Sequence, residues 1–399
     1  MGGSEDDKLS KLESIEAIEM KILFVTNNIN VPGNGICTSV NTTVQHLRNR
    51  GIDARFLSGI SKDPEVPQPD FPLNRLHFPI FQPIIDANGF SYAKRDRRVI
   101  RKAVEWADII HITEPLFLQT DAIRMAEKMG KPVVGTFHLY TQNILNEIPL
   151  ASWEWSNDLL MKNWVGAFFN HCSHVQCPTQ AVRKLLEKYD CKSSLEVISN
   201  GTRISAEPVK AGMPSTDPYL ILTTGRLCEV KKQMTLIEAM RHSRHSREIQ
   251  LYFAGNGVNR DRIMKAGSKL VSEGVLRYQP VIEFHTAAEL EALNRKAYLY
   301  VHCSKMEVEG LGCLEAIREG AVPVIAQGEL VGTSDFALDD RSLFPAGDAR
   351  ALAERIDWWI EHPREREIMG QEYADFSRKF DIEASITSLI EMYEKALAR

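Results

Sequence analysis

The sequence predicts an α/β protein with two domains, each built on a parallel β-sheet that helices cover. Short apolar runs of the length of buried strands alternate with segments of helical periodicity along most of the chain. Such alternation is typical of parallel sheets with helices on both faces. The alternation stops in a proline-containing stretch, residues 205–218, and then restarts. The 399 residues are many for a single core and sufficient for two domains of about 150–200 residues each.

The composition argues against several classes of protein. The formal net charge is −5 and 25% of the residues are charged, so no global positive field points to nucleic acid. Seven cysteines, without the paired spacing of a zinc site, indicate reduced thiols and a cytoplasmic compartment. No apolar run approaches the roughly 18–20 residues that span a bilayer, and no signal peptide is recognisable. We therefore expect a soluble or peripheral protein.

The first domain opens with a strand, a glycine loop and a helix. Residues 1–19 have no strand pattern and are interpreted as a polar leader, and residues 21–26 form a buried strand. Gly33 and Gly35 then allow a tight loop without side chains, and helical periodicity begins at Thr38. In a doubly wound domain this loop lies at the carboxyl edge of the sheet, where ligands bind.

The remaining elements follow in the same alternation. Further strands are predicted at residues 54–57, 109–112, 132–136, 175–177, 195–198, 219–224, 251–254, 298–301 and 322–326. Residues 58–90 lack periodicity and are predicted to be loop, with one short strand near residues 76–78. An amphipathic helix is predicted at residues 380–397.

Residues 298–326 are the part of the chain with the clearest chemistry. They predict a strand, a loop, a helix and a second strand, with Glu307 in the loop and Glu315 eight residues later in the helix. Gly310 and Gly312 flank the start of that helix, where free amides and the helix dipole favour a phosphate group. The carboxylates can accept hydrogen bonds from sugar hydroxyls. This predicts a sugar-nucleotide site; the alternative is two solvated surface acids.

The spacing Glu307-x7-Glu315, followed by Ala-Ile and Glu-Gly-Ala-Val-Pro-Val-Ile-Ala, resembles the signature of retaining glycosyltransferase family 4. Residues 304–316, SKMEVEGLGCLEA, resemble the branch that glycosylates diacylglycerol. Residues 225–232, GRLCEVKK, resemble the family motif whose arginine and lysine hold the donor diphosphate, which implies Arg226 and Lys231. Val230 stands where the family has an acid, so the choice between Lys231 and Lys232 stays open.

The resemblance implies the GT-B architecture, with two Rossmann-like domains that face a cleft and a last helix that crosses back. The domains would be residues 20–205 with 380–399, and residues 206–379. His138 follows a predicted strand and resembles the histidine that approaches the donor sugar in diacylglycerol glucosyltransferases. The implied catalytic residues are His138, Glu307, Arg226 and Lys231. The implied donor-binding residues are Gly33, Gly35, Arg226, Lys231, Gly310, Leu311, Gly312 and Glu315.

The implied reaction moves glucose or galactose from a UDP-sugar to a membrane lipid such as diacylglycerol or ceramide, with retention. It needs neither a cofactor nor a metal, because an arginine and lysine pair supplies the positive charge at the diphosphate. Alternatives are a soluble or polysaccharide acceptor, a nucleotide-sugar epimerase, a glycoside hydrolase that uses the two acids, and a non-catalytic scaffold.

A cationic segment suggests how a lipid acceptor is reached. Residues 92–106 predict a helix with a buried stripe and six cations on its outer face, namely Lys94, Arg95, Arg97, Arg98, Arg101 and Lys102. Five aromatic residues follow in a second stretch, namely Trp153, Trp155, Trp164, Phe168 and Phe169. Together they predict a peripheral protein on the inner face of the plasma membrane, bound to anionic lipid.

Overall fold

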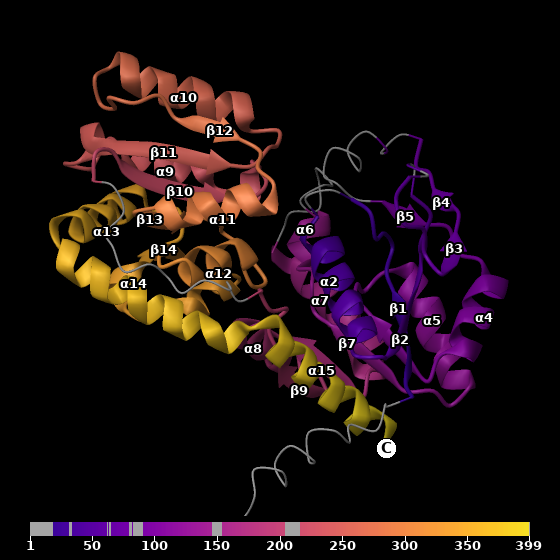
Figure 1. The fold of residues 1–399 in the computed structure, drawn as a ribbon. Helices are drawn as coiled ribbons and strands as arrows, with labels where there is room; N and C mark the ends of the chain where they lie inside the picture. The colour runs from indigo at the N-terminus through magenta and orange to yellow at the C-terminus, as the bar shows by residue number, and fades with distance from the viewer. Residues whose placement is uncertain are drawn as a thin grey trace, which may run out of the picture.

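The structure, a computed structural model, describes residues 19–31, 34–61, 63, 65–79, 82, 91–145, 154–203 and 216–398. Two Rossmann-like domains, each with a parallel sheet between helices, form the described part of the chain (Figure 1). The predicted leader, except for Glu19, and residues 205–215 of the predicted linker lie outside the described residues, as does Gly33.

The N-terminal domain contains a seven-stranded sheet in the order β3-β2-β1-β6-β7-β8-β9. All neighbouring strands in it are parallel. The strands are β1 (Lys21–Val25), β2 (Asp53–Gly59), β3 (Phe71–Leu73), β6 (Ile109–Ile112), β7 (Val133–Thr136), β8 (His174–Cys177) and β9 (Ser194–Val197). The carboxyl ends of β1, β6 and β7 therefore meet at one edge of the sheet, as the alternation predicted.

The region predicted as loop contains more structure than expected. β3 adds the edge strand of the sheet, and β4 (Arg75–Leu76) pairs antiparallel with β5 (Tyr92–Ala93). The predicted strand near residues 76–78 is displaced, because pairing with β5 ends at Leu76. Such short edge strands, one of them containing Pro72, have too few residues for a periodic pattern.

Helices cover both faces of this sheet. They are α2 (Gly35–Asn49), α4 (Arg97–Trp106), α5 (Phe117–Lys128), α6 (Thr141–Leu145), α7 (Glu154–Ala167) and α8 (Gln180–Lys188). Alternate residues of β1 point to opposite faces: Leu23 joins the core that contains α4, α5, α7 and α8, and Phe24 joins the core that contains α2.

Three predictions in this domain need correction. The helix predicted at residues 92–106 begins only at Arg97, because the Asp96 side chain caps it by accepting a hydrogen bond from the Arg98 amide. Lys94 and Arg95 therefore precede α4.

Gly35 is the first residue of α2 rather than part of a loop, because the Asn34 side chain caps the helix by accepting a hydrogen bond from the Ile36 amide at 2.9 Å. Of the aromatic residues predicted at a membrane surface, three are buried core residues that pack under β7 and β8, namely Trp164, Phe168 and Phe169. Trp155 is 61% exposed, and Trp153 lies outside the described residues.

The C-terminal domain contains a six-stranded parallel sheet in the order β12-β11-β10-β13-β14-β15. The strands are β10 (Tyr219–Thr224), β11 (Ile249–Ala254), β12 (Val281–Glu283), β13 (Leu299–His302), β14 (Val322–Gln327) and β15 (Leu343–Pro345). The helices are α9 (Gln233–Ala239), α10 (Arg260–Ser272), α11 (Ala287–Lys296), α12 (Leu311–Arg318), α13 (Ala349–Glu361) and α14 (Pro363–Ser377). One apolar cluster fills this domain on both sides of β10 and β13.

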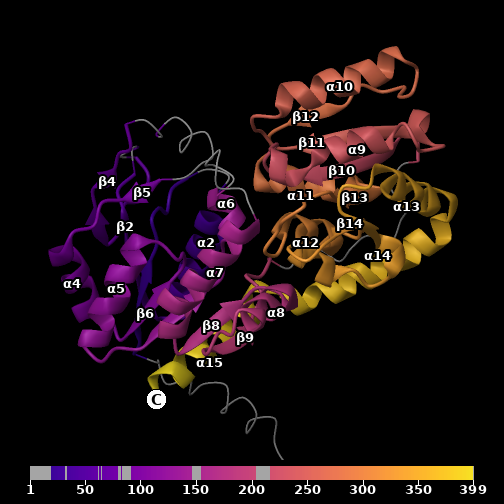
Figure 2. The same cartoon turned by 180° about the vertical axis from the view of Figure 1, so that it is seen from behind.

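The last helix, α15 (Ile382–Leu397), leaves the C-terminal domain and packs against the N-terminal one (Figures 1 and 2). Its buried residues Leu389 and Met392 join the core under α2. At the crossing, the Thr202 amide donates to the Phe380 carbonyl at 2.8 Å, and the Ile382 amide donates to the Thr202 carbonyl at 2.9 Å. The predicted crossing helix is thus present. Among the described residues, no helix combines the length and the apolar character that would let it cross a bilayer.

Candidate functional site

The predicted strand, loop and helix of residues 298–326 form as expected, as β13, a loop, α12 and β14. We call residues 303–310 the donor loop, after the role that the sequence predicts for Glu307. Gly310, at its end, has φ +91° and caps α12, and a Cβ there would lie 2.4 Å from Thr333 Oγ1. A Cβ on Gly312 would lie 2.2 Å from Thr224 Oγ1. Gly312 therefore lets α12 begin directly against the carboxyl ends of β10 and β13, and Gly310 lets the helix start pass close to Thr333.

Glu307 lies in a compact charged cluster. Lys231 Nζ donates to Glu307 Oε2, and His302 Nε2 lies 3.3 Å from the same oxygen. Burial raises the pKa of Glu307, but the charge of Lys231 and the interactions with His302 outweigh burial and hold the pKa well below its usual range. The carboxylate therefore stays ionised at neutral pH, as an acceptor for hydroxyl groups.

Glu315, in α12, has different surroundings. Burial raises its pKa, and the nearby charge of Arg318 offsets this in part. Among the residues that the structure describes, no hydrogen bond to the Glu315 carboxylate is found. The charges of Glu307 and Glu315 both act on the hydroxyl of Tyr300, which bonds Thr224 at 2.9 Å. The two acids thus flank the start of α12.

The geometry distinguishes the two lysines that the motif left open. Lys231 contacts Glu307, whereas Lys232 adopts a left-handed conformation with φ +50° and pairs with Glu229. Arg226 is exposed at the carboxyl end of β10, one residue after Gly225. The site therefore contains Lys231 and the end of β10 that bears Arg226.

Across from the donor loop, the N-terminal domain contributes His138 and Tyr140, which follow β7. His138 is half-buried, and burial lowers its pKa to about 4, so its imidazole is neutral at physiological pH. Tyr140 is 2% exposed, and within the described chain its hydroxyl has no hydrogen-bond partner. Burial raises the pKa of Tyr140, and the charges of Glu307 and Asp335 raise it further. The Tyr140 hydroxyl therefore lies within the electrostatic influence of acids of the other domain.

A cavity of about 540 Å³ adjoins Tyr140 between the two domains. Residues of α6, α7 and α8 form most of its wall, and Glu329 and Leu330 close it from the C-terminal domain. Its lining mixes apolar side chains such as Met161 with polar ones such as Asn157. The cavity can accept a ligand that has both characters.

Two buried acids were not found by sequence reasoning. Glu114, after β6, accepts hydrogen bonds from the Asn27 amide at 3.0 Å and from Gln119 Nε2 at 3.0 Å, and burial raises its pKa. Glu309, in the donor loop, is 3% exposed. The position of Glu114 after an apolar strand was an available signal, whereas Glu309 lies within the motif itself and was passed over.

Comparison with known proteins identifies the family. A model described as Glycosyltransferase Family 4 matches residues 33–205, and one described as Glycosyl transferases group 1 matches residues 207–375. The chain belongs to glycosyltransferase family 4. This glycosyltransferase has the GT-B fold, as its two sheets and returning helix indicate.

Relatives and solved structures agree with this assignment. The glycosyltransferase is 24% identical to an alpha-monoglucosyldiacylglycerol synthase of Streptococcus pneumoniae over 327 residues, which is 77% of this chain and 71% of the relative. It is 22% identical to the sulfoquinovosyl transferase SQD2 of Arabidopsis thaliana over 73% of this chain and 57% of the relative. The structure of Anabaena Alr3699/HepE in complex with UDP superimposes with a TM-score of 0.70 at 16% identity, covering 94% of this chain and 100% of that one. At that identity the likeness concerns the fold.

Proposed function

We propose that this glycosyltransferase moves glucose or galactose from a UDP-sugar to a membrane lipid such as diacylglycerol or ceramide, with retention of configuration and without a metal. The observation that carries the proposal is the Lys231–Glu307–His302 cluster, which adjoins the start of α12. A cation and a helix N-terminus suit the diphosphate, and an ionised carboxylate suits the sugar hydroxyls.

The proposed donor follows from this chemistry and from the fold's neighbours. Arg226 and Lys231 would stabilise negative charge on the diphosphate as the glycosidic bond breaks, which removes the need for a metal. Gly310, Leu311 and Gly312 would bring the α12 amides close to a phosphate. A neutral His138 would contact the sugar. A solved neighbour, Alr3699/HepE, has been captured with UDP-glucose, which supports a UDP-sugar here.

Retention is proposed through reaction on one face of the sugar, with the leaving phosphate taking the acceptor proton. Glu307 is held ionised, so it is unsuited to donating a proton as the general acid of a hydrolase. No protein nucleophile is assigned.

The lipid acceptor is supported by the names of the relatives and by the cavity beside Tyr140. One relative is named for a glucosyldiacylglycerol, and the mixed lining of the cavity suits the polar end of an amphipathic molecule. We propose that the acceptor hydroxyl enters from this side.

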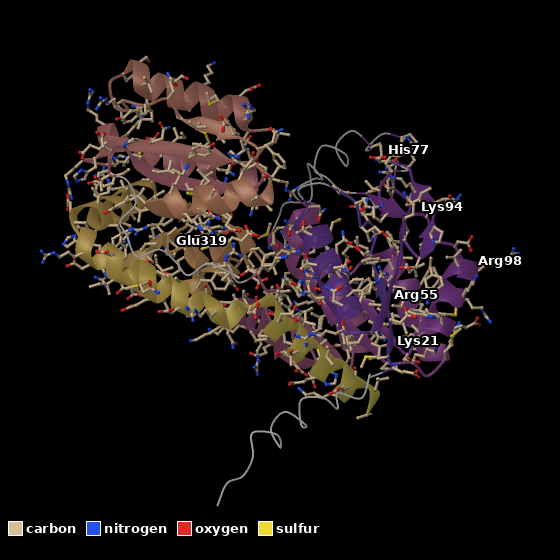
Figure 3. All side chains as sticks on the ribbon, viewed as in Figure 1. Lys21, Arg55, His77, Lys94, Arg98 and Glu319 are labelled. Carbon is tan, nitrogen blue, oxygen red and sulfur yellow. The ribbon has the colours of Figure 1, made fainter. Side chains whose placement is uncertain are left out.

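The basic surface of α4 would hold the enzyme at the membrane. Its cations are exposed, as are Lys94 and Arg95 just before it. Lys94 and Arg98 lie on the outer edge of the N-terminal domain, on the side away from the C-terminal domain (Figure 3). Beside them Phe117 is 76% exposed, with the Arg95 guanidinium 5.6 Å from its ring centre. An exposed aromatic ring among cations suits an anionic bilayer surface, which supports a peripheral position on the inner face of the plasma membrane.

A panel assay tests the proposal. UDP-glucose and UDP-galactose are each incubated with diacylglycerol, ceramide and soluble sugar acceptors, with and without EDTA, and the products are read by mass and by anomeric NMR signals. We expect a glycolipid with the anomeric configuration of the donor, in equal yield with EDTA. Transfer only to a soluble acceptor would contradict the lipid acceptor, and an epimerised sugar formed without acceptor would contradict transfer. An inverted anomer would contradict retention, and loss of activity that manganese restores would contradict metal independence.

A further inference from the structure

Glu309 is a buried carboxylate between the two domains. It extends from the donor loop to the N-terminal domain, where the Ser199 hydroxyl donates to its Oε1. The Asn200 amide donates to both carboxylate oxygens at 3.2 Å, and Asn200 Nδ2 donates to Oε2. These hydrogen-bond donors to Glu309 are all neutral and belong to the N-terminal domain. Glu309 itself lies only two residues from Glu307 in the donor loop.

The residues that Glu309 contacts form the point where the chain leaves the N-terminal domain. We call residues 199–202 the hinge turn. Gly201 has φ +76°, and a Cβ on it would lie 2.6 Å from Ile382 Cα, where α15 begins. Asn200 Oδ1 also accepts a hydrogen bond from Ser39 of α2 at 2.7 Å. Both chain crossings and α2 therefore meet at the group that Glu309 binds.

Other contacts dock the same loop on the same domain. Met306 is buried in the core under α7 and α8, and Thr179 Oγ1 donates to the Val308 carbonyl at 3.0 Å. The donor loop thus touches the N-terminal domain on both sides of Glu307. Glu309 differs from these contacts because its charge has no cation beside it among the residues that the structure describes. Burial and the charge of Glu307 raise its pKa to about 7, against the opposing effect of Ser199 and Asn200. The carboxylate therefore depends on the hinge turn for its stabilisation.

We propose that Glu309 is a positioning residue that holds the donor loop against the hinge turn. This contact sets the position of His138, in the N-terminal domain, relative to a sugar bound at Glu307. Glu309 itself touches no reacting atom. β9, which leads into the hinge turn, pairs with β8, and β8 pairs with β7, which precedes His138. A shift of the hinge turn would therefore move His138 with the sheet. This inference rests on the proposed donor chemistry at Glu307.

The test compares Glu309→Ala and Glu309→Gln with a matched control, Glu273→Ala. Glu273 also bonds a side chain of another element, Arg241 at 2.7 Å, but it is exposed and lies outside the donor loop, the hinge turn and the cavity wall. Hydrogen exchange of the peptide that spans the hinge turn is measured first. We expect exchange at least about 10-fold faster in both Glu309 variants and unchanged in the control.

Turnover and UDP affinity are then measured on the same proteins. We expect the turnover number to fall at least about 10-fold in the Glu309 variants, while the Kd for UDP changes by less than about 3-fold. The double variant Glu309→Gln with Asn200→Asp exchanges donor and acceptor across the same contact, and we expect it to recover much of the lost turnover. Such recovery would assign the loss to this contact, and the split between turnover and UDP affinity distinguishes positioning from a donor contact.

Two results would overturn the inference. Unchanged exchange in the hinge turn would mean that the carboxylate does not hold it, and an equal loss of UDP affinity and turnover would make Glu309 a donor contact. A wild-type enzyme that fails to use any UDP-sugar would contradict the proposed function, and the exchange measurement would still decide the role of Glu309.

Discussion

Two glutamates eight residues apart have opposite electrostatic surroundings in this enzyme. Glu307 is surrounded by Lys231 and His302, which lower its pKa, whereas burial raises the pKa of Glu315. Opposed shifts of neighbouring acids are typical of a functional site, where each carboxylate has its own task. In the proposed function both are ligands for the donor.

We predict that Glu307→Gln and Glu315→Gln each reduce transfer by at least about 100-fold, because each removes a charge-assisted contact in a closed site. Initial rates measure the loss, and circular dichroism checks that the fold survives. Glu273→Gln is the matched control on the exposed surface, away from both sites. Near-normal rates in a folded Glu307 or Glu315 variant would show that the assignment of the donor site is wrong.

For His138→Ala, we predict that the turnover number falls more than the affinity for UDP. In the proposed function the neutral imidazole lies near the sugar rather than the nucleotide, so it acts mainly as the glycosidic bond breaks. Steady-state kinetics and UDP titration separate the two quantities. If both fall by the same factor, His138 is a nucleotide or structural contact instead.

The lowered pKa of the half-buried His138 also predicts a pH dependence of stability. Its pKa is about 4 in the folded protein and near 6.5 when unfolded, so the unfolded chain binds more protons between these values. The unfolding free energy therefore falls as pH drops from about 6.5 to 4, by at most about 1.4 kcal/mol per pH unit from this group. Denaturation at several pH values should give a shallower decline for His138→Asn than for the wild type. The exposed His77, labelled in Figure 3, provides the control, and a decline equally shallow in His77→Asn would contradict the prediction.

At the scale of a single element, α4 shows how one helix serves two environments. Ile100, Ala103 and Val104 pack into the core, and Asp96 caps the helix by accepting from the Arg98 amide at 2.8 Å. The opposite face carries cations that contribute little to the fold. A surface of this kind is available to an anionic partner without cost to folding.

We predict that reversing Lys94, Arg98 and Lys102 to Glu abolishes cosedimentation with anionic vesicles and leaves UDP affinity unchanged. Arg95 and Arg101 are left intact because they pair with Asp121 and Glu105. Each cation near an anionic leaflet contributes about 1 kcal/mol of binding free energy. Reversing three of them therefore removes more binding free energy than a reversible attachment provides.

The matched control for this experiment makes the same charge change on the other domain. Reversing Arg260, Lys265 and Lys296 to Glu alters three exposed cations of α10 and α11. If both triple variants lose vesicle binding equally, net charge rather than α4 explains the attachment.

At the scale of the whole molecule, α15 makes the N-terminal domain depend on the last residues of the chain. We predict that Leu389→Ala lowers the unfolding free energy by about 2–4 kcal/mol, because it opens a cavity in the core under α2. Leu397→Ala, in the same helix but 44% exposed, should change it by less than about 0.5 kcal/mol. Equal effects in denaturant unfolding would mean that the crossing contact is not part of that core.

Local sequence patterns were sufficient to predict much of the fold of this protein. Strand, loop and helix at residues 298–326 are encoded by apolar runs, helical spacing and two glycines, all of which act within a few residues. The two-domain architecture follows because the same alternation restarts after a proline-containing stretch. These features depend on neighbours in the chain, so the sequence alone determined them.

Only the tertiary structure decided the features that join distant residues. Lys231 rather than Lys232 reaches Glu307 across 76 positions, and Glu309 reaches Asn200 across 109. Trp164 is an interior residue, although the aromatic stretch that contains it resembles one at a membrane surface. Periodicity tells which side of an element is apolar, but it does not tell what covers that side. Partners are chosen when the two sheets and α15 pack together, and that choice is a property of the folded chain.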